Sequence, residues 1–160
     1  SKIFDIKPLL IPLNSKPGTS PELSKDFGYV SLSHCKDAIL VGWCQMKIGI
    51  DIERRDRAIS QNLKDFFLLK KEFQAGDKSL FRDENEFFLA LWTAKESAIK
   101  WDRSSIFRDI NSWDLDNKLK TVTHCKRKIS LQLINYCFKD WIISAVSEKK
   151  SFLLKSKIYF

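Results

Sequence analysis

Residues 84–101 read ENEFFLALWTAKESAIKW and predict one long helix. Apolar side chains recur in this stretch at the 3.6-residue period of a helix with one buried face. They are Phe87, Phe88, Leu91, Ala94, Ala98 and Trp101. Asp83 stands directly before the stretch and carries the short polar side chain that caps a helix amino terminus. Such a helix needs an apolar surface to pack against, and the flanking segments must supply it.

The segments before this helix predict strands. Residues 27–32 and 38–44 are rich in apolar and β-branched side chains, and 48–53 alternates isoleucine with glycine or acidic residues, which is the period of a half-buried strand. The short spacers between them favour hairpins or a meander. Ser60 caps a shorter helix over 61–69, and 70–73 add a short helical turn.

Strands are also predicted after the long helix, at residues 112–116, 130–136, 141–146 and 152–158. Because strands are grouped with strands and helices with helices, the sequence favours an α+β class. We expect an antiparallel sheet packed with one long helix and one or two short ones.

The length of 160 residues suits one compact domain or two small halves that share a core. The net charge of +8 favours an anionic partner. Nucleic acid, an acidic membrane surface, a nucleotide cofactor and an acidic protein all satisfy this charge, and charge alone does not choose among them.

Four widely spaced cysteines predict buried free thiols and a reducing cytoplasm. They are Cys35, Cys44, Cys125 and Cys137. No apolar run approaches the ~20 residues of a membrane-spanning helix, and the first residues, SKIFDIKPLL, lack the layout of a signal peptide. We therefore expect a cytoplasmic protein that does not act on a membrane.

Two carboxylates lie in the strand at 48–53. Asp51 and Glu53 project from one face of it, ~6.6 Å apart along the backbone. At that spacing their charges repel by roughly 2.4 kcal/mol at an effective dielectric of about 20. Arg54, Arg55 or a metal ion would offset the repulsion in a partly buried site. Taken alone, this pattern is equally that of an ordinary strand end with a solvated polar face.

Trp92, Glu96 and Lys100 form an i, i+4, i+8 series on one stripe of the long helix. Alone, the series describes a surface ion pair beside a core tryptophan. Together with the strand carboxylates, Glu96 completes a set of three oxygen ligands of the kind that magnesium, manganese or calcium prefer over zinc. A basic chain with an acidic metal site suits a phosphate-bearing substrate.

Histidines give a weaker signal. His34 ends the stretch Ser31-Leu32-Ser33-His34 at a strand end, where it is either structural or a hydrogen-bond donor to a phosphate oxygen. His124 lies in a basic stretch without such a context and is expected at the surface.

Three sequence motifs of the chain resemble the motifs of a known family. Residues 49–53 (GIDIE) and 92–100 (WTAKESAIK) are similar to the two signature blocks of the 4′-phosphopantetheinyl transferases, and 31–34 (SLSH) resembles a third. Lys16-Pro17 resembles a Gly-Lys-Pro element, with Ser15 in place of glycine. Their order and spacing resemble the surfactin-synthetase-activating type, and the resemblance runs from about Leu13 to Lys100.

The resemblance implies a 4′-phosphopantetheinyl transferase-like fold. It also implies transfer of the phosphopantetheine arm of coenzyme A to a serine of an acidic acyl or peptidyl carrier protein. This is the reaction of holo-acyl-carrier-protein synthesis, which serves fatty acid or polyketide biosynthesis. The implied metal is Mg²⁺, with Mn²⁺ as a substitute. Its ligands match Asp51, Glu53 and Glu96. Glu96 also matches the base for the carrier serine, and Lys100 matches a lysine that stabilises the pyrophosphate. Lys16, Ser33 and His34 match contacts to coenzyme A.

The chain also departs from the family pattern. Members of this type have two pseudo-symmetric halves with coenzyme A between them, whereas here residues 1–45 match only a remnant of the first half and 46–160 match the second half with the metal site. We expect a partial pseudo-two-fold in a single domain. A dimer could restore the cleft, and the choice between monomer and dimer stays open. Residues 101–105 lack the glycine that the family tends to have after the helix.

Two other functions stay open. An inactive or binding-only homologue would bind coenzyme A or carrier protein without transfer. A metal-dependent nuclease would use similar acidic residues and suit the charge. However, the order Lys95-Glu96 on a helix differs from the strand-borne Glu-x-Lys pattern of such enzymes, and no nucleic-acid partner is expected.

Overall fold

The structure is a computed structural model that describes residue 5, residues 7–15, 19–69, 72 and 77–148. Its centre is a five-stranded antiparallel sheet in the order β5-β9-β8-β7-β6. The strands are β5 (Ile48–Arg54), β6 (Trp113–Leu115), β7 (Thr121–His124), β8 (Ile129–Phe138) and β9 (Trp141–Ser147). β5 forms one edge of this sheet.

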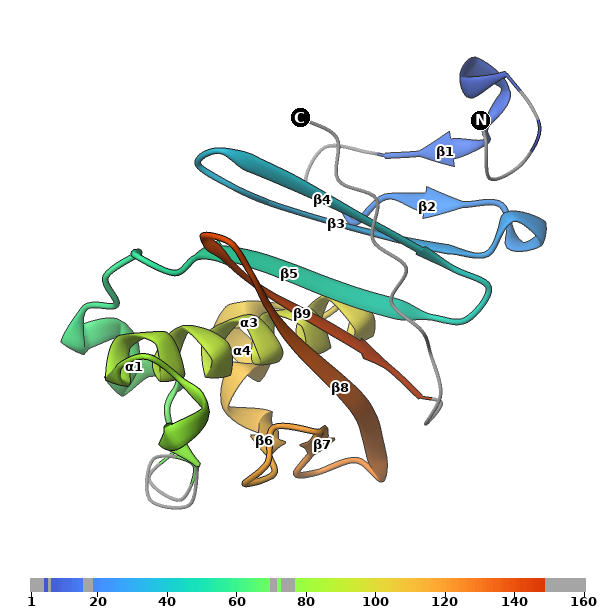
Figure 1. The fold of residues 1–160 in the computed structure, drawn as a ribbon. Coiled ribbons are helices and arrows are strands. Elements are labelled where there is room, and N and C mark those ends of the chain that lie inside the picture. The colour runs from blue at the N-terminus through green and yellow to red at the C-terminus, as the bar shows by residue number, and fades with distance from the viewer. Residues whose placement is uncertain (1–4, 6, 16–18, 70–71, 73–76, 149–160) are drawn as a thin grey trace.

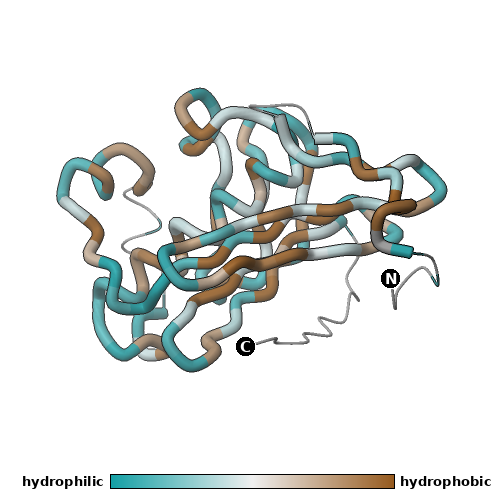
Figure 2. The backbone as a smooth tube through the Cα atoms, turned by 90° about the horizontal axis from the view of Figure 1, so that it is seen from above, coloured by the Kyte–Doolittle hydropathy of each residue, from teal (hydrophilic) through white to brown (hydrophobic). Residues whose placement is uncertain are grey.

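The long helix α3 (Glu84–Asp102) covers one face of the sheet, where it packs on β5 and β9 (Figure 1). All six apolar positions that predicted its inner face are buried. The shorter helices α1 (Gln61–Phe67) and α4 (Ile106–Asp109) lie beside it. The main core therefore lies between α3 and the sheet, and Figure 2 shows apolar stretches along the strands and hydrophilic ones in many of the connecting turns.

A hairpin of β3 (Tyr29–Cys35) and β4 (Ala38–Cys44) packs on the opposite face of β5. Its inner side forms a second small core with Ile48 and Ile50. The molecule thus has three layers, which are hairpin, sheet and helix (Figure 1). A two-residue pair, β1 (Leu13–Asn14) and β2 (Glu22–Leu23), precedes the hairpin. Short 3₁₀ turns span Pro8–Leu10, Lys25–Phe27, Lys78–Leu80 and Ile110–Ser112.

The α+β prediction is confirmed. Six predicted strands and both predicted helices are present, and Ser60 and Asp83 each cap their helix through a side-chain oxygen. β7 and α4 were not predicted, because each is only four residues long and carries no clear period. The predicted strand at 152–158 and most of the predicted turn at 70–73 lie outside the described residues. No helix in the described part of the chain is long and apolar enough to cross a membrane.

Two burial predictions were wrong. All four cysteines are free thiols, but Cys125 and Cys137 are exposed, because Cys125 follows the end of β7 and Cys137 lies near the end of β8. His124 is buried rather than at the surface. Its ring packs edge-on against Trp113, and its Nδ1 accepts backbone N–H groups from Lys126 and Arg127. Burial, reinforced by the charge of Arg127, lowers the pKa of His124.

Candidate functional site

The predicted carboxylates meet because β5 lies unusually close to α3. Gly49 makes this approach possible, since a Cβ atom at this position would stand 1.9 Å from the carbonyl oxygen of Ser97 and 2.6 Å from the backbone nitrogen of Trp101. Any side chain here would push strand and helix apart. The glycine of the first motif therefore brings the strand that carries Asp51 onto the helix that carries Glu96.

Asp51 is the centre of the site. Its Oδ1 accepts the ammonium of Lys100 and the hydroxyl of Ser33, each at 2.6 Å. Its side chain is 3% exposed, and its Oδ2 has no hydrogen-bond partner among the described residues. A buried carboxylate oxygen without a partner is costly unless a ligand satisfies it.

Two serines of β3 hold the outer edge of β5. Ser31 accepts the backbone N–H of Ile50, and Ser33 accepts that of Ile52. Ser33 also receives a hydrogen bond from Lys100 at 2.8 Å while donating to Asp51. A serine hydroxyl has one donor and two acceptor sites, so the hydrogen-bonding capacity of Ser33 is filled. In this structure Ser33 positions Asp51 and Lys100, and its contact with coenzyme A stays a prediction.

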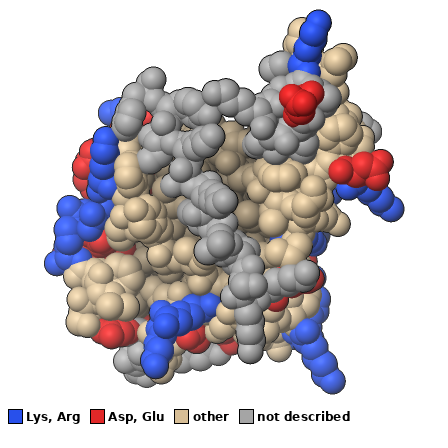
Figure 3. Space-filling view, turned by 45° about the vertical axis from the view of Figure 1, so that its right-hand side comes forward, with Lys and Arg blue, Asp and Glu red and all other residues tan. Residues whose placement is uncertain are grey.

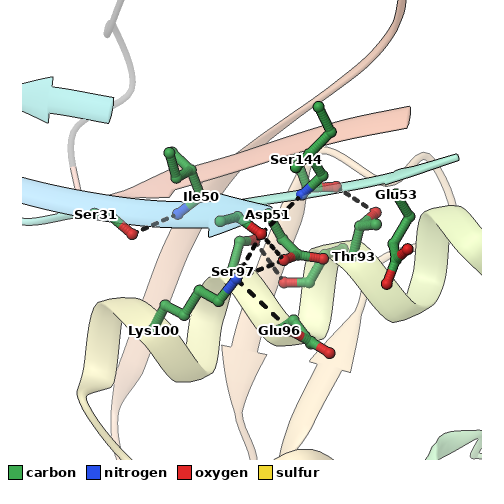
Figure 4. A network of polar contacts seen from close by, with 12 residues as sticks. Ser31, Ile50, Asp51, Glu53, Thr93, Glu96, Ser97, Lys100 and Ser144 are labelled. Carbon is green, nitrogen blue, oxygen red and sulfur yellow. Dashed lines mark hydrogen bonds and ion pairs between the residues drawn. The ribbon is translucent and has the colours of Figure 1, made fainter. Parts of the chain in front are cut away.

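Glu96 lies one turn before Lys100 on α3, and its Oε2 is 3.7 Å from the lysine ammonium. Figure 4 shows the lysine side chain reaching toward both Asp51 and Glu96. The Glu96 side chain is 14% exposed. Burial, and then the negative charge of Asp51, raise the pKa of Glu96 to about 7, although Lys100 and Arg57 act in the opposite direction. Burial and the charge of Asp51 therefore disfavour the ionised form of Glu96, beside a single ammonium.

Glu53 projects from the same side of β5 but lies apart from the other two carboxylates (Figure 4). Its Oε1 accepts a hydrogen bond from Arg57, whose guanidinium lies 5.9 Å from the centre of the Trp92 ring. Within the described residues, no three His, Cys, Asp or Glu side chains gather closely enough to hold a metal ion as they stand. The structure therefore brings Asp51, Glu96 and Lys100 together and leaves Glu53 paired elsewhere.

The donor set nevertheless fits a magnesium ion. Magnesium is usually held by one or two carboxylates together with waters and substrate phosphates. Asp51 offers a buried oxygen without a partner and Glu96 offers a second carboxylate. Glu53 could join them only after it separates from Arg57. All of these ligands are hard oxygen atoms, as magnesium and manganese prefer.

His34 and Lys16 are not brought to the carboxylates. His34 is exposed on β3, on the face opposite to that of its neighbour Ser33, because successive side chains of a strand alternate. Lys16 lies outside the described residues. Their predicted contacts with coenzyme A stay predictions.

Lys95, which precedes Glu96, lies on the other side of α3. It is fully buried, and its ammonium is 2.8 Å from both the Glu72 carboxylate and the carbonyl oxygen of Phe67. Glu72 also accepts the backbone N–H groups of Leu69 and Leu115. The pair ties α3 to the segment after α1 and to β6. It therefore fixes the rotation of the helix that presents Glu96 and Lys100.

Sequence reasoning did not find two parts of this arrangement. The role of Ser33 in holding Asp51 depends on the packing of β3 across β5, which no spacing in the sequence indicates. The contact of Arg57 with Glu53 was the second part that sequence reasoning missed. Arg57 follows Glu53 by four residues, which is the only hint of their pairing in the sequence. That spacing predicts a contact between side chains only within a helix, and Glu53 lies on a strand.

Residues 47–146 match the family model of the 4′-phosphopantetheinyl transferase superfamily. The chain belongs to the 4′-phosphopantetheinyl transferase superfamily. The matched region begins just before β5 and ends within β9, so it contains the sheet, α3 and the three carboxylates.

The family is one of transferases that move phosphopantetheine from coenzyme A to carrier proteins, typically with a divalent metal. The β3–β4 hairpin, with Ser31 and Ser33, precedes the matched region. A search of curated proteins gave no match to this phosphopantetheinyl transferase chain.

Proposed function

We propose that this chain transfers the 4′-phosphopantetheine arm of coenzyme A to a serine of an acyl or peptidyl carrier protein, in the cytoplasm and with Mg²⁺, releasing 3′,5′-ADP. We assign it to the surfactin-synthetase-activating type on the order of its motifs. The observation that carries the proposal is the convergence of Asp51, Glu96 and Lys100 at the contact of β5 with α3.

In the proposed reaction the carrier serine hydroxyl forms a bond to the β-phosphorus of coenzyme A, and the bond from that phosphorus to the bridging pyrophosphate oxygen breaks. Glu96, the more exposed of the two converging carboxylates, accepts the serine proton directly or through a water. Lys100 turns its ammonium from Asp51 to the pyrophosphate and offsets the charge on the leaving 3′,5′-ADP.

Asp51, Glu96 and, after release from Arg57, Glu53 would hold the magnesium ion. When bound, the ion supplies positive charge to the pyrophosphate. The remaining contribution of the protein is to orient the reacting groups, since phosphoryl transfer depends chiefly on positioning and charge neutralisation.

The charge of the chain supports an acidic partner. The net charge is +8, and on the face drawn in Figure 3 lysine and arginine side chains stand mainly around the margin of the molecule. Such a distribution attracts an acidic carrier protein over long range and speeds its encounter with the site.

The test is an intact-mass assay of an apo carrier protein incubated with this chain, coenzyme A and Mg²⁺, with EDTA in a parallel sample. We expect a gain of one phosphopantetheine that disappears with EDTA. Binding of coenzyme A without any mass gain would identify a binding-only homologue instead. Cleavage of plasmid with Mg²⁺ and no effect of coenzyme A would identify a nuclease.

The site assignment is tested by Asp51→Asn and Glu96→Gln, which keep the size of each side chain but remove its charge. We expect each to lower the transfer rate by about a hundredfold or more, because each removes a proposed metal ligand. Asp140→Ala, at an exposed turn, is the control and should leave the rate unchanged. Normal turnover with unchanged Mg²⁺ dependence in either site variant would contradict the assignment.

A further inference from the structure

A cavity of about 460 Å³ opens between the 3₁₀ turn at Lys78–Leu80, the turn that precedes β7 and the second half of β8. Its described lining reaches Ala90 of α3 but includes none of the proposed catalytic or metal-binding residues. The volume lies within the range of small-molecule sites in proteins. The proposed transfer reaction gives this cavity no role.

The walls of the cavity are chiefly apolar. The apolar side chains come from the 3₁₀ turn, α3, β8 and β9, and they are Leu80, Phe81, Ala90, Leu119, Leu133, Ile134 and Ile142. Most of these are buried or half-buried, whereas Leu80 is 65% exposed. A ligand that fills this space needs an apolar body, because the walls offer it few polar partners.

Two lysines add charge to this apolar space. Lys118 and Lys120 lie in the turn before β7, and both line the cavity and are exposed. Neither forms an ion pair with a carboxylate in the described part of the chain, and the described lining contains no carboxylate. The cavity therefore attracts a ligand with an anionic group.

The cationic and uncharged parts of the lining lie at different places along β8. The backbone N–H of Leu133 donates to the carbonyl oxygen of Lys120, so the lysines adjoin this part of the strand. Cys137 also lines the cavity, four residues further along and about 13 Å away, and it stands opposite Ile142 of β9. Burial and the nearby Glu86 raise the pKa of Cys137, so its thiol is uncharged at neutral pH.

One buried donor of the lining has no partner. Asn135 lies on β8 between the two ends, and its Oδ1 accepts the hydroxyl of Ser144. Its Nδ2 is buried and has no hydrogen-bond partner among the described residues. Such a donor calls for an acceptor atom. A carboxylate oxygen would satisfy it, whereas a plain hydrocarbon would not.

We propose that this cavity binds a free medium-chain fatty carboxylate. The carboxylate contacts Lys118, Lys120 and the amide of Asn135, and the alkyl chain runs along β8 toward Cys137. The distance along the strand and the apolar walls set the length and nature of the chain. The proposal does not depend on the transfer activity, because none of the transfer residues lines the cavity. Unspecific adsorption of an amphiphile to the protein surface is the competing explanation.

The first test is titration calorimetry of the chain with octanoate, decanoate and dodecanoate, each below the concentration at which it forms micelles. We expect the affinity to rise by up to about fourfold for each added methylene, because each is removed from water. Decanoate should bind about threefold more tightly than decan-1-ol, which has the same chain without the charge. Acetate should not bind.

Three variants locate the ligand. Lys118→Gln combined with Lys120→Gln should remove the preference for decanoate over decan-1-ol and leave the affinity for the alcohol unchanged. Lys36→Gln, at an exposed position outside the cavity, is the matched control. Leu80→Gln should weaken both ligands by about threefold or more, since it removes apolar wall, and its exposure lets the variant fold.

The two exposed cysteines give a second readout. Cys137 lines the cavity and Cys125 does not. We expect decanoate to slow the alkylation of Cys137 by a neutral maleimide severalfold and to leave that of Cys125 unchanged, as peptide mass spectrometry measures.

Every outcome bears on the proposal. No binding of decanoate, or equal slowing at both cysteines, overturns it in favour of unspecific adsorption or of an empty cavity. An unchanged preference in the double lysine variant overturns the assigned carboxylate contacts. Unchanged affinity in Leu80→Gln overturns the location. Transfer measured in the mass assay neither adds to nor removes from these results, so failure of one proposal leaves the other standing.

Discussion

At the residue scale, the site is organised by how many partners each polar atom has. The Lys100 ammonium contacts Asp51, Ser33 and Glu96, and the Ser33 hydroxyl already makes all the hydrogen bonds that it can make. Oδ2 of Asp51 is the one fully buried polar atom of this cluster that lacks a hydrogen-bond partner among the described residues. We propose that the magnesium ion binds at this oxygen.

Ser33→Ala tests this positioning role. The change removes the donor that orients Asp51, and we expect the transfer rate to fall about tenfold or more and the apparent affinity for Mg²⁺ to weaken in parallel. Ser31→Ala is the matched control, since Ser31 caps the same strand edge at Ile50 without touching Asp51. Transfer rates measured across a Mg²⁺ titration check the prediction. Equal losses in both variants would mean that the serines only stabilise the strand.

The site residues were predictable to different degrees. Local periodicity predicts that Asp51 and Glu53 share one face of the strand. It also predicts that Glu96 and Lys100 lie one turn apart on the helix. Both features are present in the structure. Whether two carboxylates converge depends on tertiary partners, as Glu53 shows by pairing with Arg57. Local patterns carry no information about such partners.

At the element scale, the contact of β5 with α3 fixes the geometry of the site. The strand brings Asp51 and the helix brings Glu96 and Lys100, and the Lys95–Glu72 pair holds the helix from its other side. Both elements were predicted nearly to their ends, because the period of 2 in the strand and of 3.6 in the helix are both strong. The hairpin β3–β4 was predicted as two strands, but its packing across β5 was not.

Gly49→Ala should separate the strand from the helix. We expect the free energy of unfolding to fall by about 3 kcal/mol, because the new methyl group would overlap backbone atoms that cannot move without shifting a whole element. Gly42→Ala is the matched control, since its methyl group would meet only the Ile50 side chain, at 2.9 Å, and should cost about 1 kcal/mol. Urea unfolding of both variants checks the difference. A cost at Gly49 no larger than that at Gly42 would contradict the close approach.

At the scale of the whole molecule, the three layers leave the site at the junction of hairpin, sheet and helix. The α+β class followed from the grouping of strands and helices along the chain. The division into residues 1–45 and 46–160, with its partial pseudo-two-fold, stays a prediction, because the sequence shows no internal repeat that would define it. The family match covers most of the second part and none of the first.

The stability of the molecule should fall in acid through Glu86. This buried carboxylate at the start of α3 pairs with Arg55 and Arg82, and although burial opposes ionisation, the two arginines hold its pKa below the usual range. A lowered pKa in the folded state adds stability above the unfolded pKa of about 4.3, and that stability is lost as pH falls through the folded value.

Glu86→Gln removes this contribution. We expect it to lower the free energy of unfolding by roughly 2 kcal/mol at pH 7, and the difference from the unaltered chain should shrink below about pH 4.3, where the unaltered carboxylate also becomes neutral. Urea unfolding at a series of pH values measures both. A difference that stays constant down to pH ~3 would show that the charge of Glu86 is not what stabilises the fold.

The strand that carries Asp51 is also the edge strand of its sheet, and an exposed edge strand is a template on which another chain can add and start aggregation. Here the outward amides of Ile50 and Ile52 are taken by the serine hydroxyls of β3. The Ser33 hydroxyl, which orients Asp51, therefore also acts with Ser31 to keep this edge from pairing with a neighbouring molecule. Selection for solubility would act on both serines, whereas selection for catalysis would act on Ser33.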